Sequence, residues 1–328
     1  VSFAEGGELV GIDEKTGLEK SRTKIRVGVR TPVYPHEDYW TVASGDDRVY
    51  GLSPTDGRRL WHVTINDLVT GSDWRAENPE VSVFMTRTGT LTAVDLDIRG
   101  IAWQTPFRKP ECSAPTLAPP LVFVGCEDYY LYALSVKSGL EQWKVCLSAP
   151  VLEKPVAAHG RVYATTADGV LHAVDIERQE VLWANPQGGR VLTATEEWVV
   201  LHRRTKELNL IAVADAATGK VTAQATARDH EYFAADPTSG IFIAANERGD
   251  VLAIGVRKVV EAQAAARAAR ASERLSQTQS RATTPTPPSA GTPAASPATV
   301  RPAAPAPAAT PTTTAKPSGG GPKYFLVH

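Results

Sequence analysis

Apolar and polar positions alternate along most of the chain in short runs, each ended by polar residues or glycine. Residues 131 to 145, LYALSVKSGLEQWKV, contain two such runs on either side of a Ser138-Gly139 turn. The same arrangement returns as LHAVDIERQEVLWAN, from Leu171 to Asn185. Short runs joined by a tight turn are typical of β-hairpins. The pattern therefore predicts a chain that repeats one hairpin.

The repeat has an even period. It is measured on one small residue in the first arm of each hairpin, namely Gly11, Gly51, Ala93, Ala133, Ala173, Ala212 and Ala253. The successive spacings are 40, 42, 40, 40, 39 and 41 residues. Such regularity indicates a repeat architecture in which each unit buries its apolar face against its neighbours.

Each copy is preceded by a further strand-like run, such as YWTVAS, LVFVG or RVYATT, and the connection between copies leaves room for a fourth. Four short strands per repeat are the pattern of a propeller blade. We therefore expect an all-β fold, a β-propeller of about seven four-stranded blades over residues 1–257. An eighth blade is expected if residues upstream of Val1 complete one. The first copy lacks an inner strand and the seventh lacks an outer strand.

A tryptophan recurs in the second arm of four consecutive hairpins. These residues are Trp61, Trp103, Trp143 and Trp183. A large aromatic ring repeated at blade spacing is suited to fill the wedge between neighbouring blades. We interpret all four as structural inter-blade residues rather than as ligand contacts.

The hairpin sequence resembles the pyrroloquinoline-quinone (PQQ) repeat, whose pattern is roughly L-x-A-L-D-x-x-T-G-x-x-x-W. Its acidic position is matched by Asp13, Asp95 and Asp175, whereas Ser53 and Ser135 depart from it. Its turn glycine is matched by Gly17, Gly57, Gly139 and Gly219, whereas Arg99 and Gln179 replace it. The resemblance covers about residues 1–257. It implies a propeller, and it is shared by quinone-dependent dehydrogenases and by non-catalytic scaffolds.

The net charge of −1 conceals an asymmetry. From Lys258 onward there are eight Lys and Arg against two acids, which leaves 27 basic and 34 acidic residues before it. A mildly acidic propeller argues against nucleic acid as its main partner. No run of 18 apolar residues occurs, so we expect no membrane-spanning helix.

The chain begins at Val1, within strand-like sequence, so we expect that an upstream segment such as a secretory or lipoprotein leader has been removed. Cys112, Cys126 and Cys146 have no metal-ligand spacing. Cys112 and Cys126 flank a short connection and could pair in an oxidising compartment. We favour the other interpretation, in which they are small buried residues in strands.

The last part of the chain has a different composition. Residues 258–281 are Ala-rich and favour a helix, and residues 282–317 are almost entirely Pro, Ala, Thr and Ser, which predicts a disordered segment. The tail, 282–328, ends in the apolar peptide KYFLVH. We predict that its Tyr324, Phe325, Leu326 and Val327 dock a partner as a strand-like peptide on a flexible tether. The alternatives are a frayed terminus, or a strand that completes the last blade.

The chemistry-bearing residues form no recognisable catalytic, cofactor-binding or metal-ligating pattern. By the resemblance, the dehydrogenases use adjacent cysteines and a calcium ion with an Asp base, and this chain has neither adjacent cysteines nor a calcium cluster. We therefore predict no cofactor and a non-enzymatic protein-binding scaffold of the bacterial cell envelope, periplasmic or outer-membrane-associated. In this it resembles the propeller lipoproteins of the outer-membrane β-barrel assembly machinery. The alternatives are a quinone-dependent dehydrogenase-like enzyme and a sensor or anchor module of a larger envelope complex.

Partner proteins are expected to dock on the longest connections between blades, because functional residues concentrate on loops carried by a rigid framework. These connections are predicted at residues 26–40 and 65–80. They supply side chains of the kinds that anchor interfaces, namely Tyr34, Tyr39, Trp74 and Arg75. Trp74 is equally consistent with the core, and Trp40 adjoins a predicted strand and fits the core better.

Overall fold

The computed structural model describes residues 2–5, 8–12, 18–24, 29–36, 38–75, 78–205, 208–227, 230–256 and 324–327. These residues form strands and their connections, which confirms the all-β prediction. The chain divides into two compact units, Val1–Asp250 and Val251–His328. The predicted helix at 258–281 and the Pro-rich segment 282–317 lie outside the described residues.

In the first unit, each of the first six repeats forms one antiparallel sheet whose strands follow chain order. The first sheet contains β1 (Ser2–Glu5), β2 (Glu8–Ile12) and β3 (Glu19–Lys24). The second contains β4 (Tyr34–Pro35), β5 (Trp40–Ala43), β6 (Arg48–Leu52) and β7 (Arg59–Thr64). The third contains β8 (Val69–Arg75), β9 (Asn78–Thr86), β10 (Thr90–Asp95) and β11 (Gly100–Pro106).

The later repeats continue this order. The fourth sheet contains β12 (Thr116–Ala118), β13 (Leu121–Gly125), β14 (Tyr130–Ser135) and β15 (Glu141–Cys146). The fifth contains β16 (Val156–Ala158), β17 (Arg161–Thr165), β18 (Leu171–Asp175) and β19 (Glu180–Asn185). The sixth contains β20 (Arg190–Ala194), β21 (Trp198–Arg204), β22 (Asn209–Asp215) and β23 (Val221–Thr226). The first unit ends with the antiparallel pair β24 (Tyr232–Ala235) and β25 (Ile241–Ala245).

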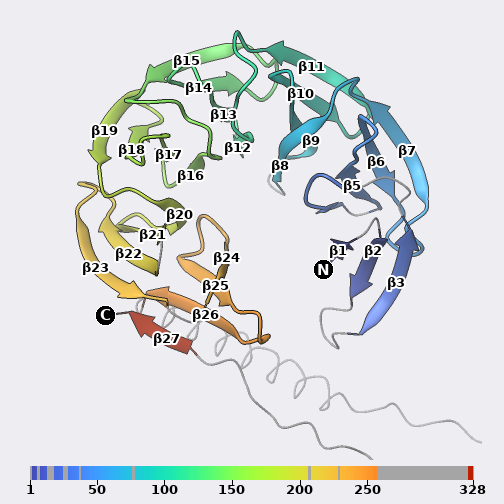
Figure 1. Cartoon of the computed structure of the whole chain (residues 1–328). Coiled ribbons are helices and arrows are strands. Elements are labelled where there is room, and N and C mark those ends of the chain that lie inside the picture. Colours follow the sequence, from blue (N-terminus) through green and yellow to red (C-terminus); the bar gives the residue numbers. More distant parts are fainter. Residues whose placement is uncertain are drawn as a thin grey trace, which may run out of the picture. The chain divides into compact units, whose positions relative to one another are not determined.

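The sheets of the first unit are blades of a β-propeller. The innermost strand of one blade contacts that of the next, since β8 touches β12, β12 touches β16 and β20 touches β24. The outermost strands, β7, β11, β15, β19 and β23, follow one another along the outside (Figure 1). In the described residues the first repeat has three strands, as its sequence predicts.

The second unit contains β26 (Val251–Val256) and β27 (Tyr324–Val327). The two strands pair in parallel, with Ala253 opposite Tyr324 and Val256 opposite Val327. The terminal apolar peptide therefore adds a strand to β26, which is the arrangement expected if it supplies an outer strand for the last repeat.

The outer hairpin turns explain the acidic and glycine positions of the repeat. Asp175 accepts the backbone N–H groups of Glu177 and Arg178 at 2.9 and 2.8 Å through Oδ1. The residue four positions after the aspartate is left-handed even where glycine is missing, with φ of 61° at Gln179 and 55° at Arg99. The turn conformation is therefore kept when the glycine is replaced, at an expected cost of about 1 kcal/mol or more for each side chain held there.

A small residue and a tryptophan face each other across the outer strand pair of successive blades. The pairs are Gly51 with Trp61, Ala93 with Trp103, Ala133 with Trp143, and Ala173 with Trp183. In the sixth blade Val213 faces Ala223, so Val213 holds the position that the sequence pattern gave to Ala212. That assignment was wrong because the pattern favoured a small residue, whereas a larger one is tolerated opposite alanine.

The tryptophans lie between neighbouring blades. Trp183 donates a hydrogen bond from Nε1 to the carbonyl oxygen of Ala216 in the sixth blade at 3.0 Å. Its ring covers Gly219, where a Cβ atom would come within 2.4 Å of the ring. Trp103 covers Gly139 of the fourth blade in the same way, and a Cβ atom at Gly139 would also come within 2.4 Å of the ring. The turn glycine thus makes room for the tryptophan of the preceding blade.

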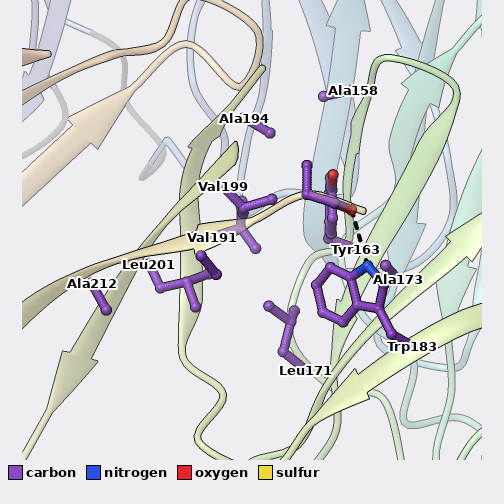
Figure 2. Close-up of a cluster of buried hydrophobic side chains, with 12 residues drawn as sticks. Ala158, Tyr163, Leu171, Ala173, Trp183, Val191, Ala194, Val199, Leu201 and Ala212 are labelled. Carbon is purple, nitrogen blue, oxygen red and sulfur yellow. Dashed lines mark hydrogen bonds between the residues drawn. The ribbon is translucent and has the colours of Figure 1, made fainter. Parts of the chain in front are cut away.

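Figure 2 shows the buried cluster to which Trp183 belongs, together with Tyr163 and Leu171 of the fifth blade and Val191 and Leu201 of the sixth. Similar clusters of buried apolar residues join the third blade to the fourth and the fourth to the fifth. The core is therefore distributed between successive blades, as the repeat predicts.

Candidate functional site

Three of the predicted docking residues meet between the second and third blades. The rings of Tyr34, beside β5, and Trp74, in β8, lie with their centroids 6.1 Å apart. His36 joins them, with its ring centroid 4.7 Å from that of Trp74 and 4.8 Å from that of Tyr39. The sequence analysis does not single out His36, because a lone histidine in a connection between blades carries no sign of which rings it will contact.

These rings are half-buried rather than projected into solvent. The Tyr34 hydroxyl lies 2.8 Å from Oγ of Ser72, and the Tyr39 hydroxyl donates to the carbonyl oxygen of Leu96 at 3.3 Å. Burial raises the pKa of both tyrosines and lowers the pKa of His36. The aromatic cluster therefore combines anchored polar ends with ring surface that stays partly accessible, a composition found in interface anchors.

The fourth predicted residue, Arg75, belongs to an ion cluster around the buried Asp73, next to the aromatic cluster. Asp73 in β8 is 6% exposed and accepts the backbone N–H of Leu117 in the fourth blade at 2.7 Å. Its carboxylate also lies 3.5 Å from Nε of Arg75 and 3.0 Å from Nζ of Lys154, which precedes the fifth blade. One carboxylate therefore links three successive blades, and its charge is matched by two cations, as a buried acid requires.

This ion cluster borders a cavity of about 430 Å³ on the inner side of the blades. Asp73, Arg75 and Lys154 contribute to its wall, with Tyr163 of β17 and Arg190 of β20 further round. Its size lies within the range of small-ligand sites. The described residues contain no group of three or more His, Cys, Asp or Glu side chains placed to hold a metal ion.

The structure corrects the assignment of residues 65–80. The sequence analysis treats them as a long connection, but Val69–Arg75 form β8, the inner strand of the third blade, and β9 begins at Asn78. The polar residues Thr70, Ser72 and Asp73 obscured the strand. Asp73 is polar because it serves the ion cluster, and that role depends on partners in other blades. No pattern in the sequence around Lys154 indicates that it belongs to this ion cluster.

The structure also corrects the interpretation of two cysteines. Cys112 and Cys126 form a disulfide, with their Cα atoms 4.0 Å apart across an antiparallel bridge. They face each other because the connection into the fourth blade runs back along the end of β13. The expectation that they are unpaired buried residues was wrong. Cys146 is free and exposed.

The remaining predicted docking residues, Tyr324, Phe325 and Leu326, lie in β27 and pair through their backbone with β26. They belong to the second unit, whereas the aromatic and ion clusters belong to the first. Among the described residues, no helix has both the length and the apolar character needed to cross a membrane.

Comparison with known proteins gives consistent results. A family model described as outer membrane protein assembly factor BamB matches residues 1–70, 67–146 and 87–291. The outer membrane protein assembly factor BamB of Yersinia pestis is 28% identical over 146 residues, which are 40% of this chain and 36% of that protein. This match thus spans well under two thirds of the relative.

Two solved structures share the fold. The crystal structure of BamB from Moraxella catarrhalis superposes with a TM-score of 0.58 at 15% identity, covering 76% of this chain and 80% of that one. A chain in the crystal structure of the mitotic checkpoint complex superposes with a TM-score of 0.59 at 12% identity, covering 76% and 81%. At such identities the likeness concerns the propeller fold alone. The family model, in contrast, matches the repeats themselves over more than half of the sequence, and the chain belongs to the outer membrane protein assembly factor BamB family.

Proposed function

We propose that this chain is a non-enzymatic protein-binding scaffold of the bacterial cell envelope that assists outer-membrane protein assembly. The observation that carries the proposal is the family match, which follows the blade repeats from residue 1 to residue 291. The family and the Yersinia pestis relative are both described as outer membrane protein assembly factor BamB. A rigid propeller framework that carries docking residues is sufficient for that role, since the role needs no bound reactant.

The Cys112–Cys126 disulfide supports a location outside the cytoplasm. Disulfides persist in oxidising compartments such as the bacterial periplasm and are rare in the cytosol, where reducing systems keep thiols reduced. We therefore propose that the protein is periplasmic or outer-membrane-associated.

We assign docking to the surface around the aromatic cluster and the connection that carries Tyr34, His36 and Tyr39. Its rings are held by packing, so a partner would not have to order flexible side chains on binding. Arg75 next to them adds a cation whose position is fixed by Asp73 at 3.5 Å. Rigid aromatic residues beside an arginine are the usual composition of energetically important contacts.

In vivo photo-crosslinking tests this proposal. A photoreactive phenylalanine analogue replaces exposed Asp38, beside Tyr39, and a matched variant carries it at exposed Lys137, in an outer turn of the fourth blade. We expect adducts with outer-membrane assembly proteins from position 38 and none from position 137. Adducts confined to position 137 would show that partners dock on another part of the propeller. Adducts with cytosolic proteins only would contradict the envelope role.

A further inference from the structure

A second cavity, of about 640 Å³, lies between the fifth and sixth blades. Its walls come from the end of β17 and the turn after it, the residues leading into β20, and the end of β21. It is separate from the aromatic cluster, which lies between the second and third blades. Nothing in the proposed docking surface uses it.

Three arginines line this cavity. Arg190 begins β20 and faces His202 across the strand pair, while Arg203 and Arg204 end β21. Glu153 is the single carboxylate among the lining residues. In the described part of the chain, none of the three guanidinium groups forms a salt bridge. An excess of cations is therefore gathered on a propeller whose other charges are mostly acidic.

Two of these arginines affect the neighbouring His202 side chain. Burial lowers the pKa of His202, and the nearby charges of Arg190 and Arg204 lower it further, although its hydrogen bond with Asn209 opposes the change. His202 is consequently neutral at neutral pH, and its Nε2 lies 3.1 Å from Oδ1 of Asn209. An anion that enters the cavity is attracted by the positive charges of these arginines.

The backbone is shaped to hold Arg203. At Gly189 a Cβ atom would come within 2.6 Å of Cγ of Arg203, and the φ of 139° at this position favours glycine. The carbonyl oxygen of Gly189 accepts a hydrogen bond from Thr165 at 3.0 Å, which fixes the segment to the fifth blade. Two blades therefore hold the wall of the cavity in place.

We propose that this arginine groove, formed by Arg190, Arg203 and Arg204, binds an acidic segment of a partner protein. Planar guanidinium groups pair with carboxylates through two hydrogen bonds at once, which suits Asp and Glu side chains. Leu152, 45% exposed, adds an apolar contact on the lining of the groove. The proposal rests on the proposed scaffold function, and it specifies that one partner binds through an acidic segment.

The chain's own tail is a poor occupant of the arginine groove. From Lys258 onward it carries eight basic residues against two acidic ones, so it has the same sign of charge as the groove. The acidic segment must therefore come from another molecule.

Binding of a synthetic peptide tests the proposal. The probe is a fluorescein-labelled decapeptide of Glu and Asp with two Leu, and fluorescence anisotropy follows its binding to the full-length protein. We expect Arg190→Gln, and the double variant Arg203→Gln with Arg204→Gln, each to weaken binding roughly tenfold or more, the usual size of a lost charge-assisted hydrogen bond. The control Arg178→Gln removes one charge, as Arg190→Gln does, from an exposed turn of the fifth blade and should leave Kd within about twofold.

Several results would overturn the proposal. Absence of binding by the unchanged protein would do so, as would an equal loss in Arg178→Gln, which would indicate unspecific attraction. Displacement of the peptide by millimolar inorganic phosphate alone would indicate a small-anion site. An arginine-dependent dimer in sedimentation would identify the occupant as a second copy. Because the crosslinks from position 38 do not depend on these arginines, their persistence would show that only the arginine groove had failed.

Discussion

At the scale of single residues, the tryptophans show how one side chain joins two blades. Trp143 is 8% exposed, its ring centroid lies 5.7 Å from that of Phe123, and it belongs to the cluster shared by the fourth and fifth blades. We expect Trp143→Ala to lower the free energy of unfolding by about 3–5 kcal/mol, as for a large aromatic truncated in a core. That corresponds to a fall of roughly 10 °C in Tm.

Thermal and denaturant unfolding would measure this loss. The control is Gln142→Ala, at the exposed neighbouring position on the same strand, which should change stability by less than about 0.5 kcal/mol. A loss under about 1 kcal/mol for Trp143→Ala would instead identify the ring as a surface residue available to ligands.

His172 gives the fold a dependence on pH. Its side chain is 5% exposed, Nε2 lies 3.0 Å from Oγ of Ser148, and burial lowers its pKa although Asp168 opposes the change. The unfolded chain then binds a proton more readily than the folded chain, so stability falls as pH decreases through about 6.5, the ordinary histidine pKa. Burial shifts His36 and His202 in the same direction.

Melting curves between pH 8 and pH 5 would test this dependence. We expect Tm to fall over that range, and to fall less in His172→Gln, which keeps a polar side chain without a titrating ring. The exposed residue His62, replaced in the same way, is the control and should leave the slope unchanged. An identical slope in His172→Gln and the unchanged protein would show that this histidine does not contribute.

At the scale of elements, the sequence predicts strands wherever the apolar pattern is local. The hairpins from Tyr130 to Cys146 and from Leu171 to Asn185 lie where their runs of apolar residues end, and their turns follow from an aspartate or serine and a left-handed residue. The inner strand β8 is harder to predict, because Thr70, Ser72 and Asp73 interrupt its apolar pattern. Strand β8 was therefore read as a loop.

The ion cluster around Asp73 and the arginine groove could not be predicted from the sequence for a related reason. Asp73 and Lys154 lie far apart in the sequence, and so do Glu153 and Arg203, so only the closure of successive blades brings each pair to a common site. The aromatic candidates were found because their residue types alone mark interface anchors. Their depth of burial could not be read from the sequence, since it depends on packing between the second and third blades.

At the scale of the whole molecule, the terminal peptide decides how the last repeat is completed. Its residues 324–327 pair with β26 in parallel, whereas the described strand pairs of the first unit are antiparallel. If the connection is as flexible as its composition predicts, closing it costs on the order of 4 kcal/mol. A few net backbone hydrogen bonds, at about 1 kcal/mol each, only just offset that cost. The pairing should therefore be close to balance, and a partner strand could compete for β26.

Truncation after Pro317 tests this balance. We expect Tm to fall by only a few degrees, and hydrogen exchange at the amides of β26 to become faster. A full-length variant with Leu326→Pro, which removes one backbone donor from β27, should reproduce both effects, because the loss comes from pairing and not from chain length. If truncation changes neither Tm nor exchange but abolishes capture of an outer-membrane partner, the peptide acts as a tethered docking segment. If the truncated protein keeps its stability, its exchange pattern and its partners, residues 324–327 neither complete a sheet nor bind a partner.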